Sequence, residues 1–406
     1  MHQPHYHGHN CEKIMAAEQL QETAAWLQTQ EPARLVNLLA ARAAARQWSM
    51  AFYRLPGQKG FRFVAAPALT SLPPETDLNE LSAGFLIGAY EGKQYFLEQL
   101  VSYNQATASL TDSTNSDFFD SLNKEKSTWQ PYTLPDDSPS TTRDEYINYV
   151  QHSIDTINQT ELIKTVPSRI KRVTLPAAFE PATTFIDLCE AYPNAFVSLL
   201  STPQTGTWLG ATPESLIEVD ETGIFTTMAL AGTQPYDGIA PLHTLPWTQK
   251  EIEEQAMVSR YIINRFKEIR LREFIETGPR TVQAGNMAHL CTTFTVDTRA
   301  THFPDLGVVM LRLLHPTSAV CGMPKEPARQ LLKEMEKHQR KLYSGYLGPL
   351  NMPDGSHIFV NLRCMEVLNG EALLYAGAGV TAYSVAAEEW QETELKCNTL
   401  LNIINS

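Results

Sequence analysis

From about residue 142 to the C-terminus, short apolar runs are separated by glycine turns and by isolated helical patterns. Helices do not alternate strictly with strands, as they would in a parallel βαβ sheet. The pattern therefore predicts an α+β fold with mainly antiparallel sheet. One helix is expected to begin near Arg143, because Thr142 and Glu145 have the spacing of a capping box and apolar residues follow at helical spacing.

The 406-residue chain divides into three parts by composition. Residues 1–15 hold a His-rich segment that we interpret as a flexible tail, with a metal-binding tail as the alternative. Residues 16–141 begin with helical spacing up to about residue 47 and are expected to support the sheets within one compact unit. Residues 142–406 carry the motifs described below. The polar stretch 111–142 is interpreted as a surface connection and a candidate lid or insertion.

Charge and hydropathy exclude several classes of protein. The net charge of -13 argues against a nucleic-acid surface, which needs clustered basic residues. No apolar run approaches the roughly 18 residues that span a bilayer, and no secretory signal is recognised. The six cysteines contain no C-x-x-C pair, which indicates reduced thiols and a cytoplasmic protein. Because the net charge is negative, a site for an anionic ligand must obtain its positive charge from a few local groups.

Two acidic clusters fall on predicted helices. Near the C-terminus, Glu389, Glu392 and Lys396 share one helix face. Glu254 lies on a second helix, which is expected to run to about Phe274 with Ile252 toward the core. Each cluster on its own is more typical of a solvated helix face. Together, however, the two helices could supply the carboxylates that Mg²⁺ prefers.

Glycine turns and one arginine suggest how an anion could be held. Backbone N–H groups near glycines can approach an anion closely, and several such turns occur in the C-terminal part. Strand alternation places Asn361 and Arg363 on the same face of a predicted strand. Arg363 could form a structural ion pair or clamp a carboxylate, and the spacing favours neither.

These segments, in this order, resemble the chorismate-utilising enzymes, which include isochorismate synthase, salicylate synthase, anthranilate synthase and aminodeoxychorismate synthase. The resemblance covers roughly residues 142–404. It depends on ordered blocks around Lys164, Glu214, His289, Tyr343 and the C-terminal glutamates. It implies two large, mostly antiparallel sheets packed together with helices outside and a deep cleft between them. Residues 142–406 would then be the chorismate-binding catalytic region.

The resemblance also assigns roles to individual residues. It implies that Glu254 and Glu392 hold Mg²⁺, with Glu389 helping directly or through water. Arg363 and Lys396 would meet the two carboxylates of chorismate, together with backbone N–H groups at the glycine turns. The complete set of substrate-binding residues that it implies is Gly232, Thr233, His289, Ala319, Arg363, Gly377, Gly379 and Lys396.

The implied reaction adds water at ring carbon C2 and removes hydroxide from C4. It therefore needs a base on one side of the ring and an acid on the other. The resemblance places the base at Lys164 and the acid at Glu214. Lys164 must be available in its neutral form, which burial or nearby positive charge favours. Glu214 must keep its proton, which requires a raised pKa.

Two positions favour isochorismate synthase within this family. Aminating members commonly carry Gln where Lys164 stands, and members that expel pyruvate or use ammonia commonly carry Thr where Ala319 stands. Pro167 matches aminating relatives and Tyr346 is bulky for its position, so salicylate synthase and an aminating synthase remain alternatives. A non-catalytic chorismate-binding protein is the alternative from another class.

Menaquinone biosynthesis is expected ahead of siderophore biosynthesis. We expect a monomer or weak dimer, with no nucleic-acid, membrane or glutamine-amidotransferase partner.

Overall fold

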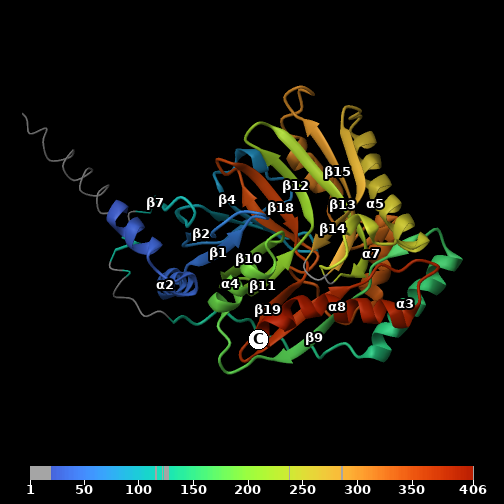
Figure 1. Cartoon of the computed structure of the whole chain (residues 1–406), viewed down its shortest axis with the longest axis horizontal. Coiled ribbons are helices and arrows are strands. Elements are labelled where there is room, and N and C mark those ends of the chain that lie inside the picture. Colours follow the sequence, from blue (N-terminus) through green and yellow to red (C-terminus); the bar gives the residue numbers. More distant parts are fainter. Residues whose placement is uncertain are drawn as a thin grey trace, which may run out of the picture.

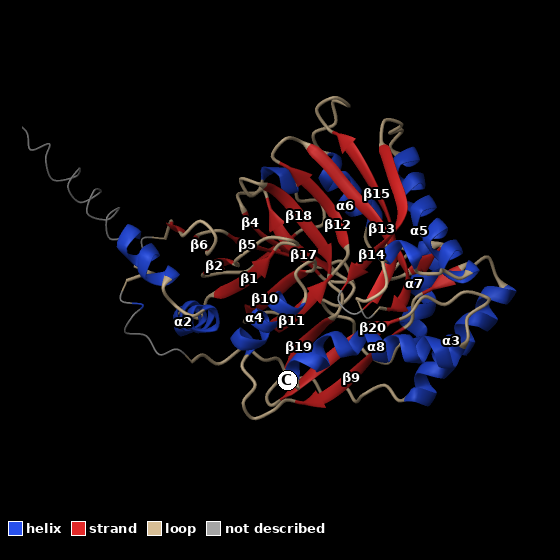
Figure 2. Ribbon diagram, viewed as in Figure 1, coloured by secondary structure: helices blue, strands red, loops and turns tan. Residues whose placement is uncertain are grey.

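The protein contains two large antiparallel sheets packed face to face, with helices on their outer faces (Figures 1 and 2). The computed structural model describes residues 20–405, except 115–116, 121, 123–127, 237 and 285–286. The predicted α+β class with mainly antiparallel sheets is confirmed. None of the helices in this described part has both the length and the apolar content that crossing a bilayer requires.

Sheet A has the strand order β7-β6-β2-β1-β10-β11-β19-β20-β9, and its neighbouring strands are antiparallel. Its strands are β1 (Ser49–Arg54), β2 (Arg62–Ala66), β6 (Val101–Asn104), β7 (Ser109–Asp112), β9 (Ser168–Thr174), β10 (Phe196–Thr202), β11 (Gly206–Thr212), β19 (Cys364–Val367) and β20 (Glu371–Gly377).

Sheet B has the order β14-β15-β13-β12-β18-β17-β4-β5-β3. Its strands are β3 (Thr70–Leu72), β4 (Gly84–Gly88), β5 (Gln94–Glu98), β12 (Ser215–Asp220), β13 (Ile224–Pro235), β14 (Ile275–Ala284), β15 (Met287–Asp297), β17 (Tyr346–Leu350) and β18 (Gly355–Val360). A separate small sheet joins β8 (Lys164–Thr165) to β16 (Gly322–Met323).

Helices cover both outer faces. They are α2 (Pro32–Ala45), α3 (Arg143–Gln159), α4 (Pro181–Ala191), α5 (Gln249–Glu268), α6 (Leu306–Leu314), α7 (Lys325–Met335) and α8 (Ala386–Ile404), with short 3₁₀ turns η1 (Leu78–Glu80) and η3 (Leu242–Thr244). α2, α4 and α8 lie on sheet A, whereas α5 and α6 lie on sheet B. The capping box predicted at the start of α3 is present, with Thr142 and Glu145 exchanging hydrogen bonds.

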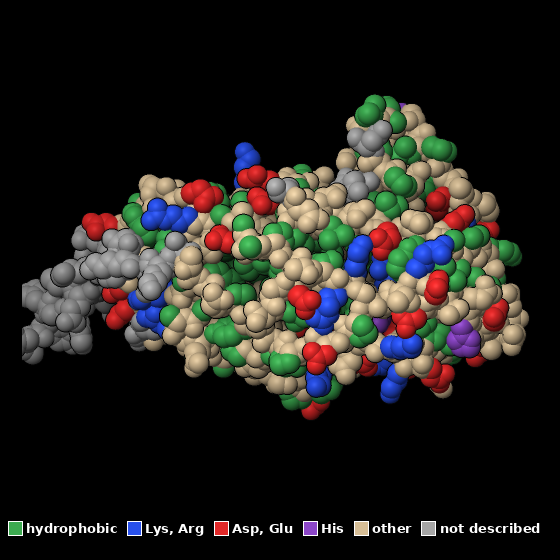
Figure 3. Space-filling view, turned by 90° about the horizontal axis from the view of Figure 1, so that it is seen from below, with side chains coloured by type: hydrophobic (Ala, Val, Ile, Leu, Met, Phe, Trp, Pro, Cys, Tyr) green, Lys and Arg blue, Asp and Glu red, His purple; other side chains and the backbone are tan. Residues whose placement is uncertain are grey.

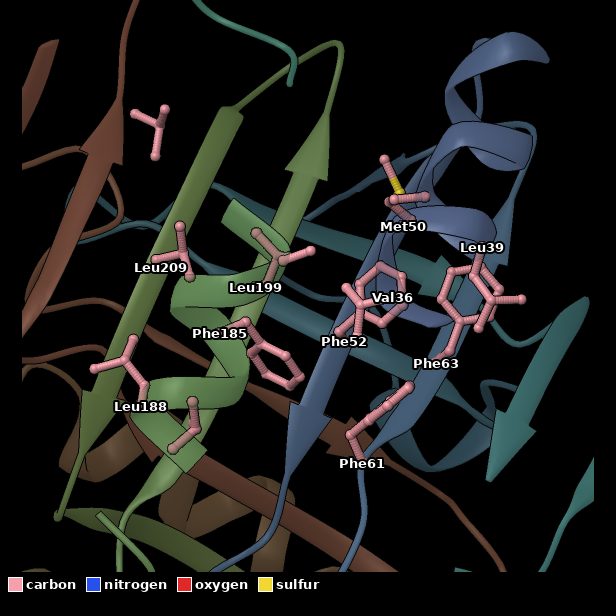
Figure 4. Packing of buried hydrophobic residues seen from close by; sticks show 14 of the residues in the cluster. Val36, Leu39, Met50, Phe52, Phe61, Phe63, Phe185, Leu188, Leu199 and Leu209 are labelled. Atoms are coloured by element: carbon pink, nitrogen blue, oxygen red, sulfur yellow. The ribbon is translucent and has the colours of Figure 1, made fainter. Parts of the chain in front are cut away.

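The apolar core is layered because both faces of each sheet are covered. On β1, Met50 and Phe52 face the helices, while Ala51 and Tyr53 face the other sheet. The helix-facing layer is rich in aromatic rings, and Phe52 lies 4.7 Å from Phe63, ring centre to ring centre (Figure 4). A strand covered on both faces has no solvent-facing side, and every residue of β1, β10 and β11 is accordingly buried.

The N-terminal region supplies strands to both sheets rather than forming a separate unit. β1 pairs with β10 in sheet A, and β4 pairs with β17 in sheet B. Residues 20–28 and α2 are helical, as predicted for residues 16–47 where the structure describes them. The His-rich tail, residues 1–15, lies outside the described residues.

Local expectations were met only in part. In the polar stretch 111–142, residues 128–140 are exposed or half-buried, as expected of a surface connection, but Phe118, Phe119 and Leu122 are buried in the core next to α2. α5 ends at Glu268 instead of Phe274, because Arg270 has a positive φ of 58° that terminates the helix. Ile252 is 47 % exposed, so it does not face the core.

Candidate active site

A pocket opens where strands of the two sheets meet helices α5 and α8. Strands β13 and β15 of sheet B and β20 of sheet A all contribute side chains to it. The pocket contains the complete set of predicted substrate-binding residues, namely Gly232, Thr233, His289, Ala319, Arg363, Gly377, Gly379 and Lys396. Glu214, Glu254 and Glu392 line it as well. The fold thus brings together residues that are widely separated in the sequence.

Lys164 lies beside this pocket on the two-residue strand β8. It is held by pairing with β16 and by a backbone bridge from Thr165 to Val380. Its side chain is 1 % exposed, and its Nζ donates to Glu254 Oε1 at 2.7 Å. Gly379 makes this contact possible, because a Cβ there would lie 2.7 Å from Glu254 Oε1 and 2.8 Å from Lys164 Cε.

Glu214 lies where the chain crosses from β11 in sheet A to β12 in sheet B. The crossing is fixed by a hydrogen bond from Val360 N to Glu214 O at 3.0 Å. The carboxyl group is buried, and burial raises its pKa to about 7, although Lys164, Lys396 and Arg363 act in the opposite direction. A carboxyl group with this pKa can hold a proton near neutral pH and donate it.

Three glutamates at the pocket and its mouth are each paired with a lysine at 2.7 Å. Two pairs join different elements: Lys164 with Glu254 of α5, and Lys250 of α5 with Glu389 of α8. The third pair, Lys396 with Glu392, lies within α8. Burial alone would raise the pKa of Glu254, but Lys164, Lys396 and Lys250 together lower it. For Glu389, burial and the nearby Glu392 raise the pKa despite Lys250.

The donor set suits a hard divalent cation. Glu254, Glu389 and Glu392 border one hollow at the pocket mouth and offer only oxygen ligands, which is the chemistry that Mg²⁺ prefers. Each carboxylate already holds a cationic partner, so the arrangement favours positive charge at this place. Within the described ranges, no three His, Cys, Asp or Glu side chains are grouped closely enough to hold a metal as they stand. A bound metal would therefore have to displace lysines.

Arg363 enters the pocket from a break between β18 and β19, so the predicted strand alternation was wrong there. Residues 361–363 are not in a strand, and Arg363 has a left-handed φ of 47°. One guanidinium nitrogen donates to His289 Nε2 at 2.8 Å, and the other ring nitrogen lies 2.9 Å from Gly232 O. Burial and Arg363 lower the pKa of His289 to about 3. His289 is therefore neutral, with its proton on Nδ1 toward Gly232.

The sequence interpretation missed several residues of the site. Lys250 pairs with Glu389, and its position four residues before Glu254 on α5 was the available signal. Tyr343 and Tyr375 form part of the pocket wall. Their neighbouring glycine blocks were recognised, but the rings themselves had no distinguishing pattern.

Comparisons with known proteins agree with this geometry. A family model described as chorismate binding enzyme matches residues 84–405. The isochorismate synthase EntC of Escherichia coli K12 is 27 % identical over 245 residues, which cover 59 % of this chain and 62 % of EntC. The match thus spans less than two-thirds of that relative. DhbC of Bacillus subtilis, also an isochorismate synthase, is 27 % identical over 298 residues, covering 70 % of this chain and 72 % of DhbC.

A solved structure extends the comparison to the fold. The structure of MenF, the menaquinone-specific isochorismate synthase of Escherichia coli, superposes with a TM-score of 0.72. It covers 90 % of this chain and 91 % of MenF at 20 % sequence identity. Similarity at this level supports the implied fold of two packed antiparallel sheets.

Proposed function

Because the chain belongs to the family of chorismate-binding enzymes, we propose that it is an isochorismate synthase, which interconverts chorismate and isochorismate with Mg²⁺. The observation that carries the proposal is the pair of buried groups at one pocket, the amine of Lys164 and the carboxyl group of Glu214, whose pKa burial raises to about 7. An amine that removes a proton from water and an acid that protonates a leaving hydroxide are the two groups that this reaction needs.

The proposed mechanism assigns one proton transfer to each group. Lys164, which pairs with Glu254 as an ammonium group, must first lose its own proton. As a neutral amine it then accepts a proton from the water that attacks C2, and Glu214 donates a proton to the hydroxyl that leaves C4. Each transfer of this kind typically contributes about 10²- to 10⁴-fold to the rate. Arg363 and Lys396 receive the carboxylates of the substrate, and His289 holds Arg363 in place without adding charge.

Mg²⁺, when bound by Glu254 and Glu392 with Glu389 in support, would neutralise a carboxylate of the substrate. The residues themselves prepare the site. Lys396 bonds to both Glu392 and Gly377 O, which places its ammonium group between a proposed metal-holding carboxylate and the pocket that Gly377 lines. The acidic protein can thereby receive a dianion.

Ala319 supports isochorismate as the final product. It lines the pocket with a methyl group, where a threonine hydroxyl would offer a further hydrogen-bonding group. We propose menaquinone biosynthesis as the pathway, ahead of siderophore synthesis, and a cytoplasmic location. The choice of menaquinone biosynthesis is supported by the shared fold with MenF, which is a menaquinone-specific isochorismate synthase.

The test is incubation of the purified protein with chorismate, with and without Mg²⁺, followed by separation and NMR of the products. Isochorismate in equilibrium with chorismate, and no product after chelation, would support the proposal. Salicylate with pyruvate would instead identify a salicylate synthase. Product formation only with ammonia would identify an aminating enzyme, and tight chorismate binding without any turnover would identify a binding protein.

A further inference from the structure

Lys341 occupies a backbone conformation that lysine disfavours. Its φ is 50°, in the left-handed region where the Cβ of an L-residue is crowded and glycine is not. Ser344, three residues later, is also left-handed, with φ of 60°. Between them lies Tyr343, which lines the active-site pocket. Such strain persists only where the surrounding structure fixes the residue, and it often marks a functional position.

The ammonium group of Lys341 is fixed by two carboxylates from distant parts of the chain. Its Nζ donates to Glu366 Oε1 at 2.8 Å and Glu366 Oε2 at 2.6 Å, and it lies 2.7 Å from Asp136 Oδ2. Glu366 is fully buried on β19, so it needs a cationic partner to remain charged. Asp136 belongs to the polar stretch that precedes α3.

Glu366 in turn holds a residue of the pocket. The hydroxyl of Tyr375 donates to Glu366 Oε2 at 3.2 Å. The ring of Tyr375 lies between two other rings, with centroid distances of 5.3 Å to Trp208 and 5.4 Å to Tyr343. The plane of the Tyr375 ring makes angles of 25° with Trp208 and 19° with Tyr343, so both pairs are stacked. Tyr343 and Tyr375 form what we call the aromatic wall of the pocket.

We propose that Lys341 is a positioning residue, which fixes the aromatic wall through Glu366 so that the flat unsaturated ring of the substrate packs against it. This inference rests on the proposed function, since it concerns the same pocket. A glycine would fit the turn at position 341 with less strain. The side chain of the lysine, rather than its backbone, therefore accounts for its presence.

Three substitutions separate the ammonium group from the turn. Lys341→Met keeps the strained backbone and removes the charge. Lys341→Gly relieves the strain and removes the charge, and Lys341→Arg keeps the charge. If the ammonium group positions the wall, the Met and Gly variants should both raise KM for chorismate about tenfold with kcat changed less than about twofold, because they lose binding of the ring. The Arg variant should stay near the wild type.

A matched control relieves the same strain elsewhere. Arg270 has φ of 58° and an exposed side chain at the end of α5. Arg270→Gly should leave KM and kcat unchanged. If Lys341→Met has the KM of the wild type, the ammonium group does not position the wall and the proposal is overturned. A change in Lys341→Gly alone would also overturn it, because the backbone turn would then be the feature that matters.

Near-ultraviolet circular dichroism gives a readout that does not need turnover. Loss of the parallel ring stack around Trp208 should change this spectrum in the Met and Gly variants and leave it unchanged in the Arg variant. An unchanged spectrum in both would contradict the inference. If the wild type does not convert chorismate, the proposed function fails, while the spectra still decide whether Lys341 holds the wall.

Discussion

Lys164 and Glu254 form a partly buried ion pair at 2.7 Å, although one lies on a two-residue strand and the other near the start of α5. The contact joins the proposed base to a proposed metal ligand. A group that binds the Glu254 carboxylate would therefore weaken its ion pair with Lys164.

Lys164→Met should abolish turnover while chorismate still binds. The loss should be about 10²-fold or more, because a general base is removed and water remains a poor nucleophile. Steady-state rates and calorimetric binding of chorismate measure the two properties. Lys337→Met, which removes an exposed lysine paired with Glu145, is the control. Retention of activity in Lys164→Met would exclude Lys164 as the base.

Glu214 should make stability depend on pH. Its pKa is about 7 in the folded protein and near 4.5 when unfolded, so the folded state binds the proton more tightly. Its contribution is complete below about pH 4.5 and is lost as the pH rises through 7. The loss can reach roughly 3 kcal/mol, and Glu214→Gln should lack it. Urea unfolding of both proteins at about pH 5 and about pH 8 measures the difference. If the free energy of unfolding changed equally with pH in the wild type and in Glu214→Gln, the raised pKa of Glu214 would be contradicted.

Gly379→Ala should inactivate the enzyme without unfolding it. The new methyl group would lie 2.7 Å from Glu254 Oε1 and 2.8 Å from Lys164 Cε, so it must push these two groups apart. Misplacement by about 1 Å can cost about 100-fold in rate. Activity and thermal unfolding should be measured together. A fully active variant would show that Lys164 and Glu254 need not meet.

Arg169 should influence metal binding from outside the pocket. It is buried on β9, donates to Thr393 Oγ1 at 2.7 Å, pairs with Glu394 and lies 4.0 Å from the centre of the Trp390 ring. These partners belong to α8, which carries Glu389 and Glu392.

Arg169→Lys should therefore weaken Mg²⁺ binding about tenfold, as loss of a group that orients metal ligands commonly does. Isothermal titration with Mg²⁺ measures the affinity directly. Arg172→Lys is the matched control on the same strand, because its hydrogen bonds go to Ser138, Asp136 and Glu371 instead of α8. Equal affinities in the two variants would mean that α8 is held independently of Arg169.

Features encoded by neighbouring residues could be predicted from the sequence. The capping box at Thr142 fixed the start of α3, because both of its partners lie within four residues. The C-terminal glutamates could be placed on one helix face by spacing alone. The grouping of the site residues required the family resemblance, since antiparallel pairing between distant strands leaves no local pattern.

Features that depend on tertiary contacts could not be predicted. Arg363 was placed on a strand, but its left-handed backbone turns it toward His289. The role of Lys250 has no local signal, because its partner Glu389 lies on another helix. Similarly, Asp136 belonged to a stretch with a surface composition, and only the fold brings it to Lys341.

The position of β20 has a consequence for biosynthesis. This late strand lies between β19 and β9, so Glu371 pairs with Thr174 from the first half of the chain. Folding must therefore close very long loops, and topologies of this kind fold slowly. Until the ribosome has made β20, β9 has no neighbour in sheet A, and its open edges can pair with other chains. Newly made protein should thus depend on protection from aggregation until synthesis is almost finished.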